Sequence, residues 1–319
     1  MIIFREFEEL RDISDPVHWA VGMFDGVHLG HSGVIAAAVE DAVHDGGIPA
    51  VLTFNSHPLA LVKPDVVPPA VIADESEKFA LMEALGVKMV LSLEFSDRLA
   101  LMMPDEFIRR LCSCCQVAQI AVGEDWHFGK GRAGNVETLR QLAGHYGFRV
   151  SVVPPILRDG VRISSTGIRE AVRRADFLQV THMLGRPYRW KGTVIHGRQL
   201  GRKLNYPTAN IKPGCGVQPP RGVYVVHAYV NGREYGGVAN LGVRPTIECE
   251  GGELLLETHL FGSPGDIYGQ RIEVEPICFL RAEVKFPSLD DLKRQLAQDT
   301  ACAVKILEQE VCKTQKTLK

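Results

Sequence analysis

The first half of this chain alternates short apolar runs with helical stretches, a pattern that few folds can accommodate. Each run is nearly all apolar, which is typical of strands buried on both faces of a parallel sheet. Asp74 and Glu77 mark the start of one intervening helix with a capping-box spacing. Right-handed crossovers between such strands predict a doubly wound, Rossmann-like α/β domain that binds ligands at the carboxyl ends of its strands. The expected strands are Trp19–Val21, Ala50–Phe54, Met89–Leu93, Gln119–Val122 and Arg149–Val153.

The second half, after about residue 185, has a different residue pattern. Glycine and proline punctuate short runs of β-forming residues, several of which alternate apolar and polar positions. Asn231-Gly232 between two such runs is a strong hairpin signal. We therefore expect a small antiparallel β-barrel, followed by an amphipathic helix from near Ser288, with domains at 1–184 and 185–319 joined near Thr181–Pro187. The expected strands are Lys191–Ile195, Val223–Val230, Glu234–Asn240, Leu254–Phe261 and Gln270–Leu280.

The decapeptide Gly-Met-Phe-Asp-Gly-Val-His-Leu-Gly-His, residues 22–31, links the first expected strand to a helix. A strand that turns through glycines into a helix points unpaired N–H groups and the positive end of the helix dipole at one spot. Such a spot binds anions, including the phosphate chain of a nucleotide. His28 and His31 can donate hydrogen bonds to phosphate oxygens there, and Gly30 lets the backbone approach the ligand closely.

The composition of the 319 residues is ordinary, with 45% hydrophobic and 23% charged residues and a net charge of -2. Basic and acidic residues balance and form no long basic run, which argues against a nucleic-acid partner. No apolar stretch reaches the length of a membrane span, and Met1–Glu9 lacks a signal-peptide layout, so we expect a cytoplasmic enzyme. Cys112, Cys114 and Cys115 cluster without a second half at zinc-ligand spacing, which favours reduced, partly buried thiols.

Taken together in order, the motifs of both halves resemble the bacterial bifunctional riboflavin kinase/FMN adenylyltransferase (FAD synthetase) family over nearly the whole chain. The first half carries the decapeptide at 22–31, Leu-Thr-Phe-x-x-His-Pro at 52–58, Phe-Gly-Lys-Gly-Arg at 128–132 and Ile-Ser-Ser-Thr-Gly-Ile-Arg at 163–169. The second carries Gly-Arg-x-Leu-Gly-Arg-Lys-Leu-Asn-Tyr-Pro-Thr-Ala-Asn-Ile at 197–211, Gly-Val-Ala-Asn-Leu-Gly-x-Arg-Pro-Thr at 237–246 and Leu-Glu-Thr-His-Leu at 256–260. The resemblance implies riboflavin, FMN, FAD and ATP as substrates or products, with Mg²⁺ as cofactor. It leaves the oligomeric state open.

For the first domain, the resemblance implies an adenylyltransferase of the HxGH nucleotidyltransferase type. His28, His31 and Arg169 are the expected catalytic residues, and Arg169 supplies a fork-shaped cation for phosphate oxygens. The remaining expected ATP-binding residues are Gly22, Phe24, Asp25, Gly26, Gly30, Ser164, Ser165 and Thr166, with His57, Pro58, Asp125 and Phe128 expected at the flavin. The run Gly129–Gly134 spells G-x-G-x-x-G, but it does not follow the first strand and lacks the later acidic residue of a dinucleotide site.

For the second domain, the resemblance implies a riboflavin kinase with Glu257 as the catalytic base. An isolated carboxylate in an otherwise apolar strand is costly unless it has a function or a partner. Thr208 and Asn210 offer oxygen ligands suited to Mg²⁺, and Pro207 fixes the backbone that presents them. The other expected residues are Gly197, Gly201, Lys203 and Pro207 at the nucleotide and Arg281 at the flavin.

The chain also departs from the family pattern. Asn55-Ser56 stands before His57 where Glu-Pro is common, Asn205 replaces a glycine, and Trp126-His127 occupies a place where Phe and Arg are frequent. These differences bear on affinity and substrate discrimination rather than on the groups that the chemistry needs. Two alternatives remain open: an adenylyltransferase with a non-catalytic flavin-binding barrel, and a nucleotidyltransferase for another phosphorylated cofactor such as a pantetheine or nicotinamide nucleotide.

Overall fold

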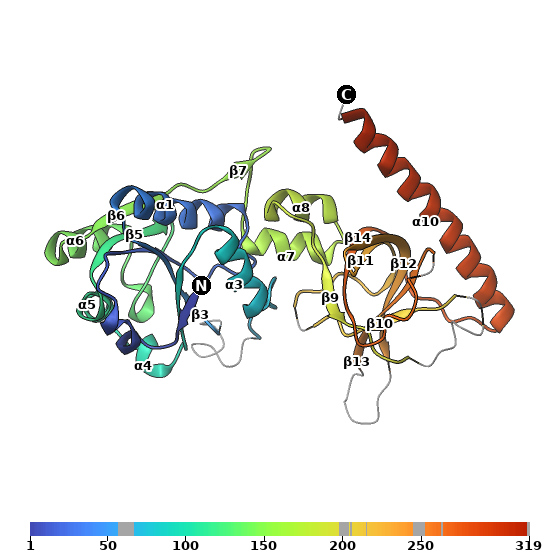
Figure 1. Cartoon of the computed structure of the whole chain (residues 1–319), viewed down its shortest axis with the longest axis horizontal. Coiled ribbons are helices and arrows are strands. Elements are labelled where there is room, and N and C mark those ends of the chain that lie inside the picture. Colours follow the sequence, from blue (N-terminus) through green and yellow to red (C-terminus); the bar gives the residue numbers. More distant parts are fainter. Residues whose placement is uncertain are drawn as a thin grey trace. The chain divides into compact units, whose positions relative to one another are not determined.

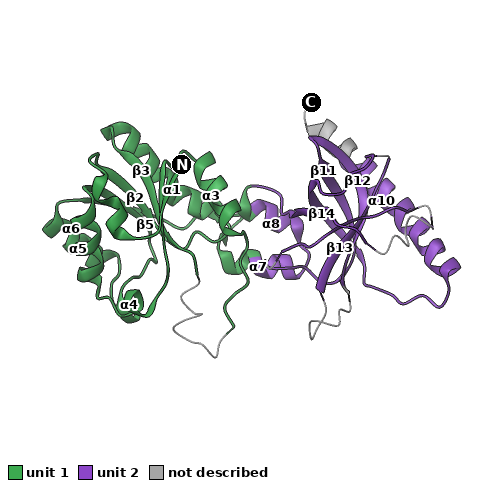
Figure 2. Cartoon of the chain, turned by 60° about the horizontal axis from the view of Figure 1, so that its bottom comes forward, with its two compact units in different colours: residues 1–168, 183–185 green, residues 169–182, 186–319 purple. Residues whose placement is uncertain are grey.

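The structure is a computed structural model, and it describes residues 1–56, 67–197, 204, 206–214, 216–244, 253–262 and 264–317 (Figure 1). His57, Pro58, Gly201 and Lys203, which the sequence analysis places at the two sites, lie outside the described residues, as does Asn205. The chain divides into two compact units (Figure 2). The first unit comprises residues 1–168 and 183–185, and the second comprises 169–182 and 186–319. The domain boundary expected after residue 184 stays a prediction.

The first unit is built on a six-stranded sheet in which every pair of neighbouring strands is parallel. Its order is β1-β4-β3-β2-β5-β6, so β3 and β4 follow β2 outward on one side, with β1 beyond them, and β6 follows β5 on the other. The doubly wound sheet is therefore confirmed, and its switch point lies between β2 and β5. The strands are β1 (Ile2–Phe4), β2 (Val17–Val21), β3 (Ile48–Phe54), β4 (Met89–Leu93), β5 (Val117–Gly123) and β6 (Arg149–Val153).

Helices cover both faces of this sheet because its buried strand residues point alternately to two separate cores. Trp19 belongs to the core that is closed by η1 (Phe7–Asp12), α5 (Pro104–Cys114) and α6 (Val136–Tyr146). Ala20 belongs to the core that is closed by α1 (Leu29–Asp45) and α3 (Glu75–Ala84). Asp74 caps α3 by accepting a hydrogen bond from the Glu77 N–H at 2.7 Å, which confirms the predicted helix start. The remaining short elements are α4 (Asp97–Ala100), η2 (Lys130–Arg132) and the hairpin of β7 (Leu157–Arg158) with β8 (Val161–Arg162).

The second unit contains an antiparallel sheet of six strands in the order β10-β13-β12-β11-β14-β9. A bridge between Ile195 and Asn210 joins the chain after β9 to β10, so the sheet nearly closes on itself, as the predicted barrel requires. The Asn231-Gly232 turn connects β11 to β12 with φ values of 51° and 71°, which confirms the hairpin. The strands are β9 (Trp190–Thr193), β10 (Ala209–Ile211), β11 (Gly222–Val230), β12 (Arg233–Arg244), β13 (Glu253–Leu260) and β14 (Arg271–Arg281).

Helix α10 (Leu289–Thr317) follows the barrel, as predicted, and packs against it through an apolar cluster that contains Val223, Val225, Val238 and Ala303. Leu307 packs onto Gly236, because a Cβ at that glycine would lie 2.6 Å from Leu307 Cδ1. Two shorter helices, α7 (Ser165–Arg173) and α8 (Phe177–Leu184), precede the barrel in the chain. Thr181–Leu184, the first residues of the expected junction, are the last residues of α8.

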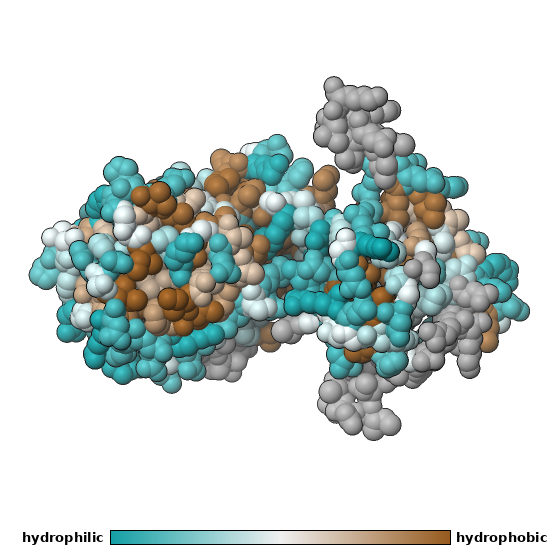
Figure 3. Space-filling view, in the orientation of Figure 1, coloured by the Kyte–Doolittle hydropathy of each residue, from teal (hydrophilic) through white to brown (hydrophobic). Residues whose placement is uncertain are grey.

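Cys112 and Cys114 lie at the end of α5 and Cys115 caps it, and all three are free, buried or half-buried thiols, as the sequence predicts. Burial raises the pKa of the Cys115 thiol to about 12 and that of Cys112 to about 11, so both thiols stay protonated and unreactive near neutral pH. None of the helices in the described part of the chain combines the length and hydropathy that a membrane crossing requires. On the face drawn in Figure 3, hydrophobic residues gather in the middle of the first unit and hydrophilic residues surround them.

Candidate active sites

The main cavity of the first unit has a volume of about 690 Å³ and lies at the carboxyl ends of four parallel strands. The last residues of β2, β3, β5 and β6 all line it: Val21, Phe54, Gly123 and Val153. The cavity therefore lies where open α/β sheets bind ligands, at the switch point of the strand order. Its lining brings together His28, His31, Gly22, Phe24, Gly30, Ser164, Ser165, Asp125 and Phe128 from the predicted site.

The loop between β2 and α1 has an unusual backbone. Phe24, Gly26 and Val27 have φ values of 50°, 80° and 38°. Positive φ is costly for bulky and β-branched residues, and such strain persists only where the surroundings hold it in place. Gly26 has no room for a side chain, because a Cβ would lie 2.8 Å from Ile72 Cγ2.

Hydrogen bonds with neighbouring segments hold this loop, and one of them runs from the Ile72 N–H to Asp25 Oδ1 at 2.8 Å. The Gly22 N–H donates to the Leu52 carbonyl at 3.1 Å, and the Thr53 hydroxyl donates to the Met23 carbonyl at 3.0 Å. The Ser165 hydroxyl donates to the Asp25 carbonyl at 3.1 Å. Strand β3 and the start of α7 therefore fix the conformation in which the loop delivers the two histidines.

His28 is the N-cap of α1, and its position determines which ring nitrogen can donate. Its Nδ1 accepts a hydrogen bond from the His31 N–H at 3.2 Å. In the neutral imidazole the proton then resides on Nε2, which becomes the donor. The His31 ring stacks on the His28 ring with centroids 3.5 Å apart and an interplanar angle of 16°. Gly30 leaves space for this arrangement, because a Cβ there would lie 3.1 Å from His28 Cε1.

The start of α7 supplies the hydroxyl groups predicted at the nucleotide. Ser164 Oγ accepts a hydrogen bond from the Gly167 N–H at 3.1 Å, so it caps the helix, while Ser165 reaches the β2–α1 loop. Thr166 is exposed and is not among the residues that line the cavity. Arg169 is buried one turn further along α7.

The other end of the cavity is aromatic and bounded by an ion pair. Trp126 stacks on Phe128 with centroids 4.4 Å apart and an interplanar angle of 13°. Asp125 pairs with Arg162 at 2.6 Å, which connects the loop after β5 to the β7–β8 hairpin. The loop from Gly129 to Gly134 contributes Gly129, Gly131 and Arg132 to the lining.

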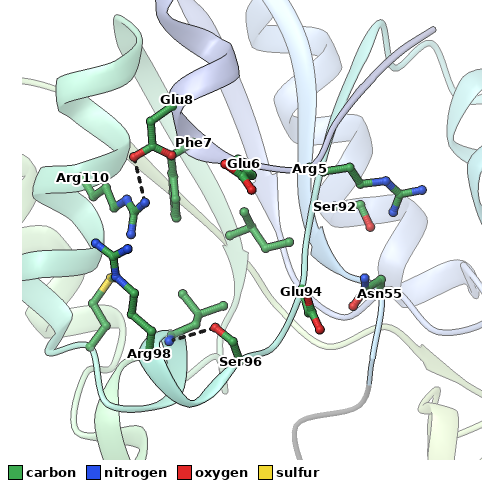
Figure 4. A pocket seen from close by; sticks show the side chains of 13 residues that line it. Arg5, Glu6, Phe7, Glu8, Asn55, Ser92, Glu94, Ser96, Arg98 and Arg110 are labelled. Atoms are coloured by element: carbon green, nitrogen blue, oxygen red, sulfur yellow. Dashed lines mark hydrogen bonds and ion pairs between the residues drawn. The ribbon is translucent and has the colours of Figure 1, made fainter.

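A second hollow in the first unit, of about 400 Å³, adjoins the cavity, since Leu99 lines both (Figure 4). Three arginines and three glutamates face it. Arg110 pairs with Glu8 at 2.8 Å, and Arg5 pairs with Glu75 on α3 at 2.6 Å. Two of its three cations are therefore already neutralised.

In the second unit, Glu257 lines a pocket of about 260 Å³ together with Thr208 and Arg281. Glu257 lies in the middle of three paired strands, opposite Asn210 on β10 and Asn240 on β12. Its side chain is exposed to the pocket side of the barrel although its strand neighbours Leu256 and Thr258 are buried. The predicted base, the threonine and the arginine are thus brought together.

Asn210 is 3% exposed and lies beneath this pocket. Its Nδ2 donates to the Thr208 carbonyl at 3.2 Å, whereas its Oδ1 is buried with no hydrogen-bond partner among the described residues. Gly197 packs against the same side chain, because a Cβ there would lie 2.6 Å from Asn210 Nδ2. A buried oxygen without a donor fits a ligand for a hard cation such as Mg²⁺. The described residues hold no cluster of His, Cys, Asp or Glu that could bind a metal.

Arg281 is held rigidly at the rim of the pocket by helix α10. Its Nε and Nη2 donate to the Asp299 carboxylate at 3.0 Å and 2.7 Å, and Asp299 is 4% exposed. A bidentate pair of this kind fixes the plane of the guanidinium group. Helix α10 therefore takes part in building the pocket.

Comparison with known proteins assigns each unit. The family model for FAD synthetase matches residues 11–167, and the model for riboflavin kinase matches residues 184–307. A bifunctional riboflavin kinase/FMN adenylyltransferase of Haemophilus influenzae is 40% identical over 285 residues, covering 89% of this chain and 92% of the relative. The chain belongs to the bifunctional riboflavin kinase/FMN adenylyltransferase family.

Other relatives agree with this membership. The bifunctional riboflavin kinase/FMN adenylyltransferase of Pseudomonas fluorescens is 38% identical over 284 residues, covering 89% of this chain and 90% of the relative. A crystal structure described as a macrolide-efflux protein from Streptococcus pneumoniae is similar in fold, with a TM-score of 0.83, 29% identity and coverage of 95% of this chain and 98% of that one. The fold of this chain and that of the Streptococcus pneumoniae structure therefore match over nearly their whole lengths.

By resemblance, the sequence places the loop from Gly123 to Arg132 at the flavin, but it does not single out Trp126, His127 or Arg132, and it indicates no role for Arg162 or Asp299. Trp126, His127, Arg132 and Arg162 line the cavity of the first unit, and Asp299 orients Arg281 in the second. Trp126 and His127 could have been singled out from the sequence, because they depart from the family pattern. Arg162 and Asp299 could not, since their partners Asp125 and Arg281 lie far from them in the sequence.

Proposed function

We propose that the chain catalyses two consecutive reactions. The second unit phosphorylates riboflavin with ATP to give FMN, and the first transfers the adenylyl group of another ATP to FMN, giving FAD and pyrophosphate. The observation that carries the proposal is that each family match contains its own site: the histidine-lined cavity in residues 11–167 and the Glu257 pocket in residues 184–307. Because both reactions consume ATP, a cytoplasmic location suits the enzyme.

Adenylyl transfer needs alignment more than it needs a base. An oxygen of the FMN phosphate attacks the α-phosphorus of ATP, and the bond to the β-phosphate oxygen breaks as pyrophosphate leaves. The attacking oxygen is already anionic, so the protein must mainly orient the reactants and neutralise the triphosphate. The His28 Nε2–H, the His31 ring and the start of α1 supply hydrogen bonds and positive potential for the phosphates. We assign ATP also to Gly22, Phe24, Asp25, Gly26, Gly30, Ser164, Ser165, Thr166 and Arg169.

We place the flavin end of FMN at the aromatic side of the same cavity. The stacked Trp126 and Phe128 rings offer an apolar surface suited to a planar heterocycle, and Asp125 lies at its polar margin. His57 and Pro58 complete the assignment from the sequence. A cavity of about 690 Å³ suits small molecules, and we propose these as the substrates.

Riboflavin phosphorylation needs a proton acceptor, because its nucleophile is a neutral hydroxyl of the ribityl chain. Glu257 accepts the proton of that hydroxyl as its oxygen attacks the γ-phosphorus of ATP and ADP leaves. We assign Thr208 and Asn210 to Mg²⁺, which would neutralise phosphate charge when bound. Gly197, Gly201, Lys203 and Pro207 are assigned to the nucleotide, and the Asp299-bound Arg281 to the flavin.

An Asn210→Ala change tests the metal assignment. We expect FMN formation to fall, and the Mg²⁺ concentration for half-maximal kinase activity to rise, by at least about 10-fold, because a buried ligand oxygen is lost. FMN-to-FAD conversion by the same protein serves as the internal control and should keep its Mg²⁺ dependence. An unchanged Mg²⁺ requirement of the kinase would remove Asn210 from the metal site.

Chromatography of flavins after incubating the protein with riboflavin, ATP and Mg²⁺ tests the whole proposal. We expect FMN to appear first and FAD to follow. FAD formed only from supplied FMN would indicate an adenylyltransferase with a non-catalytic barrel, a reading that the riboflavin kinase match does not favour. Neither product would point to another phosphorylated substrate, which the FAD synthetase match does not favour.

A further inference from the structure

Lys78 on α3 is a buried cation that the mechanism above does not use. It is 7% exposed, and its Nζ donates to Thr53 Oγ1 at 3.3 Å and to the Phe54 carbonyl at 3.1 Å. Both acceptors are neutral, and none of the ion pairs among the described residues includes Lys78. Burial lowers the pKa of Lys78, and the charges of Glu75 and Asp25 offset that effect only in part. A lysine is rarely buried in this way unless it is paired or has a function.

Glu75, one of the two carboxylates that act on Lys78, is already engaged. Glu75 accepts both guanidinium hydrogen bonds of Arg5, at 2.6 Å and 2.9 Å, and a third from the Ser92 hydroxyl at 3.1 Å. Arg5 and Ser92 approach it from the side of the second hollow, where Figure 4 shows both. The other carboxylate that acts on Lys78 belongs to Asp25, inside the β2–α1 loop. The charge of Asp25 therefore makes the β2–α1 loop part of the electrostatic environment of Lys78.

Thr53 links the ammonium group to that loop. An ammonium group can only donate hydrogen bonds, so Thr53 Oγ1 must accept from Lys78 and must direct its own hydrogen elsewhere. It donates to the Met23 carbonyl at 3.0 Å, immediately before the strained Phe24. Lys78 also holds the Phe54 carbonyl at the end of β3. One side chain thus fixes the strand end and, through Thr53, the backbone that precedes both histidines.

We propose that Lys78 is a positioning residue for adenylyl transfer, whose ammonium group orients Thr53 and thereby holds the β2–α1 loop in the strained conformation that presents His28 and His31. The proposal rests on the adenylyltransferase function proposed above. Lys78 itself does not touch the substrates. A loop released from this contact would misplace its phosphate-binding groups by a small distance, and small misplacements are costly in a reaction that depends on alignment.

The test compares Lys78→Met, Lys78→Gln and Lys78→Arg with Thr53→Val in the full chain, using FMN and ATP as substrates. We expect kcat for FAD formation to fall about 10- to 100-fold in Lys78→Met and Lys78→Gln, with KM for ATP changing much less. Lys78→Arg, which keeps the charge, should recover most of the rate. Thr53→Val should lower kcat in the same direction, and combining it with Lys78→Met should add little, because both changes break one chain of contacts.

Lys88→Met is the matched control, since Lys88 is an exposed lysine that follows the same helix, and its rates should equal those of the unchanged protein. Thermal unfolding is recorded for every variant. If Lys78→Met does not fold, the proposal is tested by the kcat of Thr53→Val, which should fall, and by that of Lys78→Arg, which should stay near normal. If folded Lys78→Met and Thr53→Val both keep the kcat of the unchanged protein, the proposal is overturned and Lys78 is a structural residue. Failure of the proposed function looks different, because the unchanged protein would then make no FAD.

Discussion

A Glu257→Gln enzyme is expected to lose riboflavin phosphorylation while it still converts supplied FMN to FAD. The change keeps the size of the side chain but removes the carboxylate that we propose as the acceptor of the ribityl hydroxyl proton. General-base catalysis contributes about 10²- to 10⁴-fold, so FMN formation should fall by that factor. Adenylylation uses a different site with no residue of β13, and its rate should stay within about 2-fold of normal. Both rates are measured by flavin chromatography on one preparation.

Glu253→Gln is the appropriate control for this change. Glu253 lies four residues earlier on β13, at the same side of the strand, and its carboxylate pairs with Lys212 at 2.5 Å near the surface. Exposed pairs of this kind contribute little, so both activities should remain. If Glu257→Gln phosphorylates riboflavin at nearly the normal rate, Glu257 is not the base and the proton must go elsewhere.

Much of the fold could be predicted because its signals are local. The runs Met89–Leu93 and Arg149–Val153 coincide with β4 and β6. All residues of β4 are buried, as expected for a continuous apolar run in a parallel sheet, whereas β6 at the sheet edge is half-buried or exposed and was indicated by its three valines. Strands β1 and β10 were missed because each has only three residues and depends on a distant partner. β1 pairs with β4, and β10 pairs with β13. A run as short as Ile2–Phe4 carries no period of its own that a sequence could display.

The sites show the same division between local and distant information. His28 and Gly30 could be found from the sequence because the turn, the cap and the helix follow one another directly. The positive φ of Phe24 and Val27 could not, since these residues disfavour it and tertiary contacts, including those with β3 and α7, impose it. The pairing of Arg281 with Asp299 likewise depends on where α10 packs. Motifs locate the groups that react, whereas tertiary contacts decide how they are held.

Replacing His28 and His31 together by alanine is expected to suppress FAD formation and spare FMN formation. The double change removes two side chains that we propose as hydrogen-bond donors to the triphosphate. Loss of a single preorganised donor costs about 10²- to 10³-fold in rate, so conversion of FMN to FAD should fall at least about 10²-fold. Riboflavin phosphorylation by the same protein reports on the second site and should not change. His44→Ala is the matched control, because His44 is an exposed histidine in the last turn of α1.

His28 has two roles that the double change cannot separate, because its Nδ1 also caps α1. Losing the cap alone should lower the free energy of unfolding by about 1 kcal/mol. His28→Asn separates the roles, since asparagine caps helices well but places no imidazole Nε2–H at the phosphates. We expect His28→Asn to unfold near the normal temperature and still lose most of its FAD synthesis. Retention of FAD synthesis in both His28→Asn and the double variant would mean that the triphosphate of ATP binds away from the start of α1.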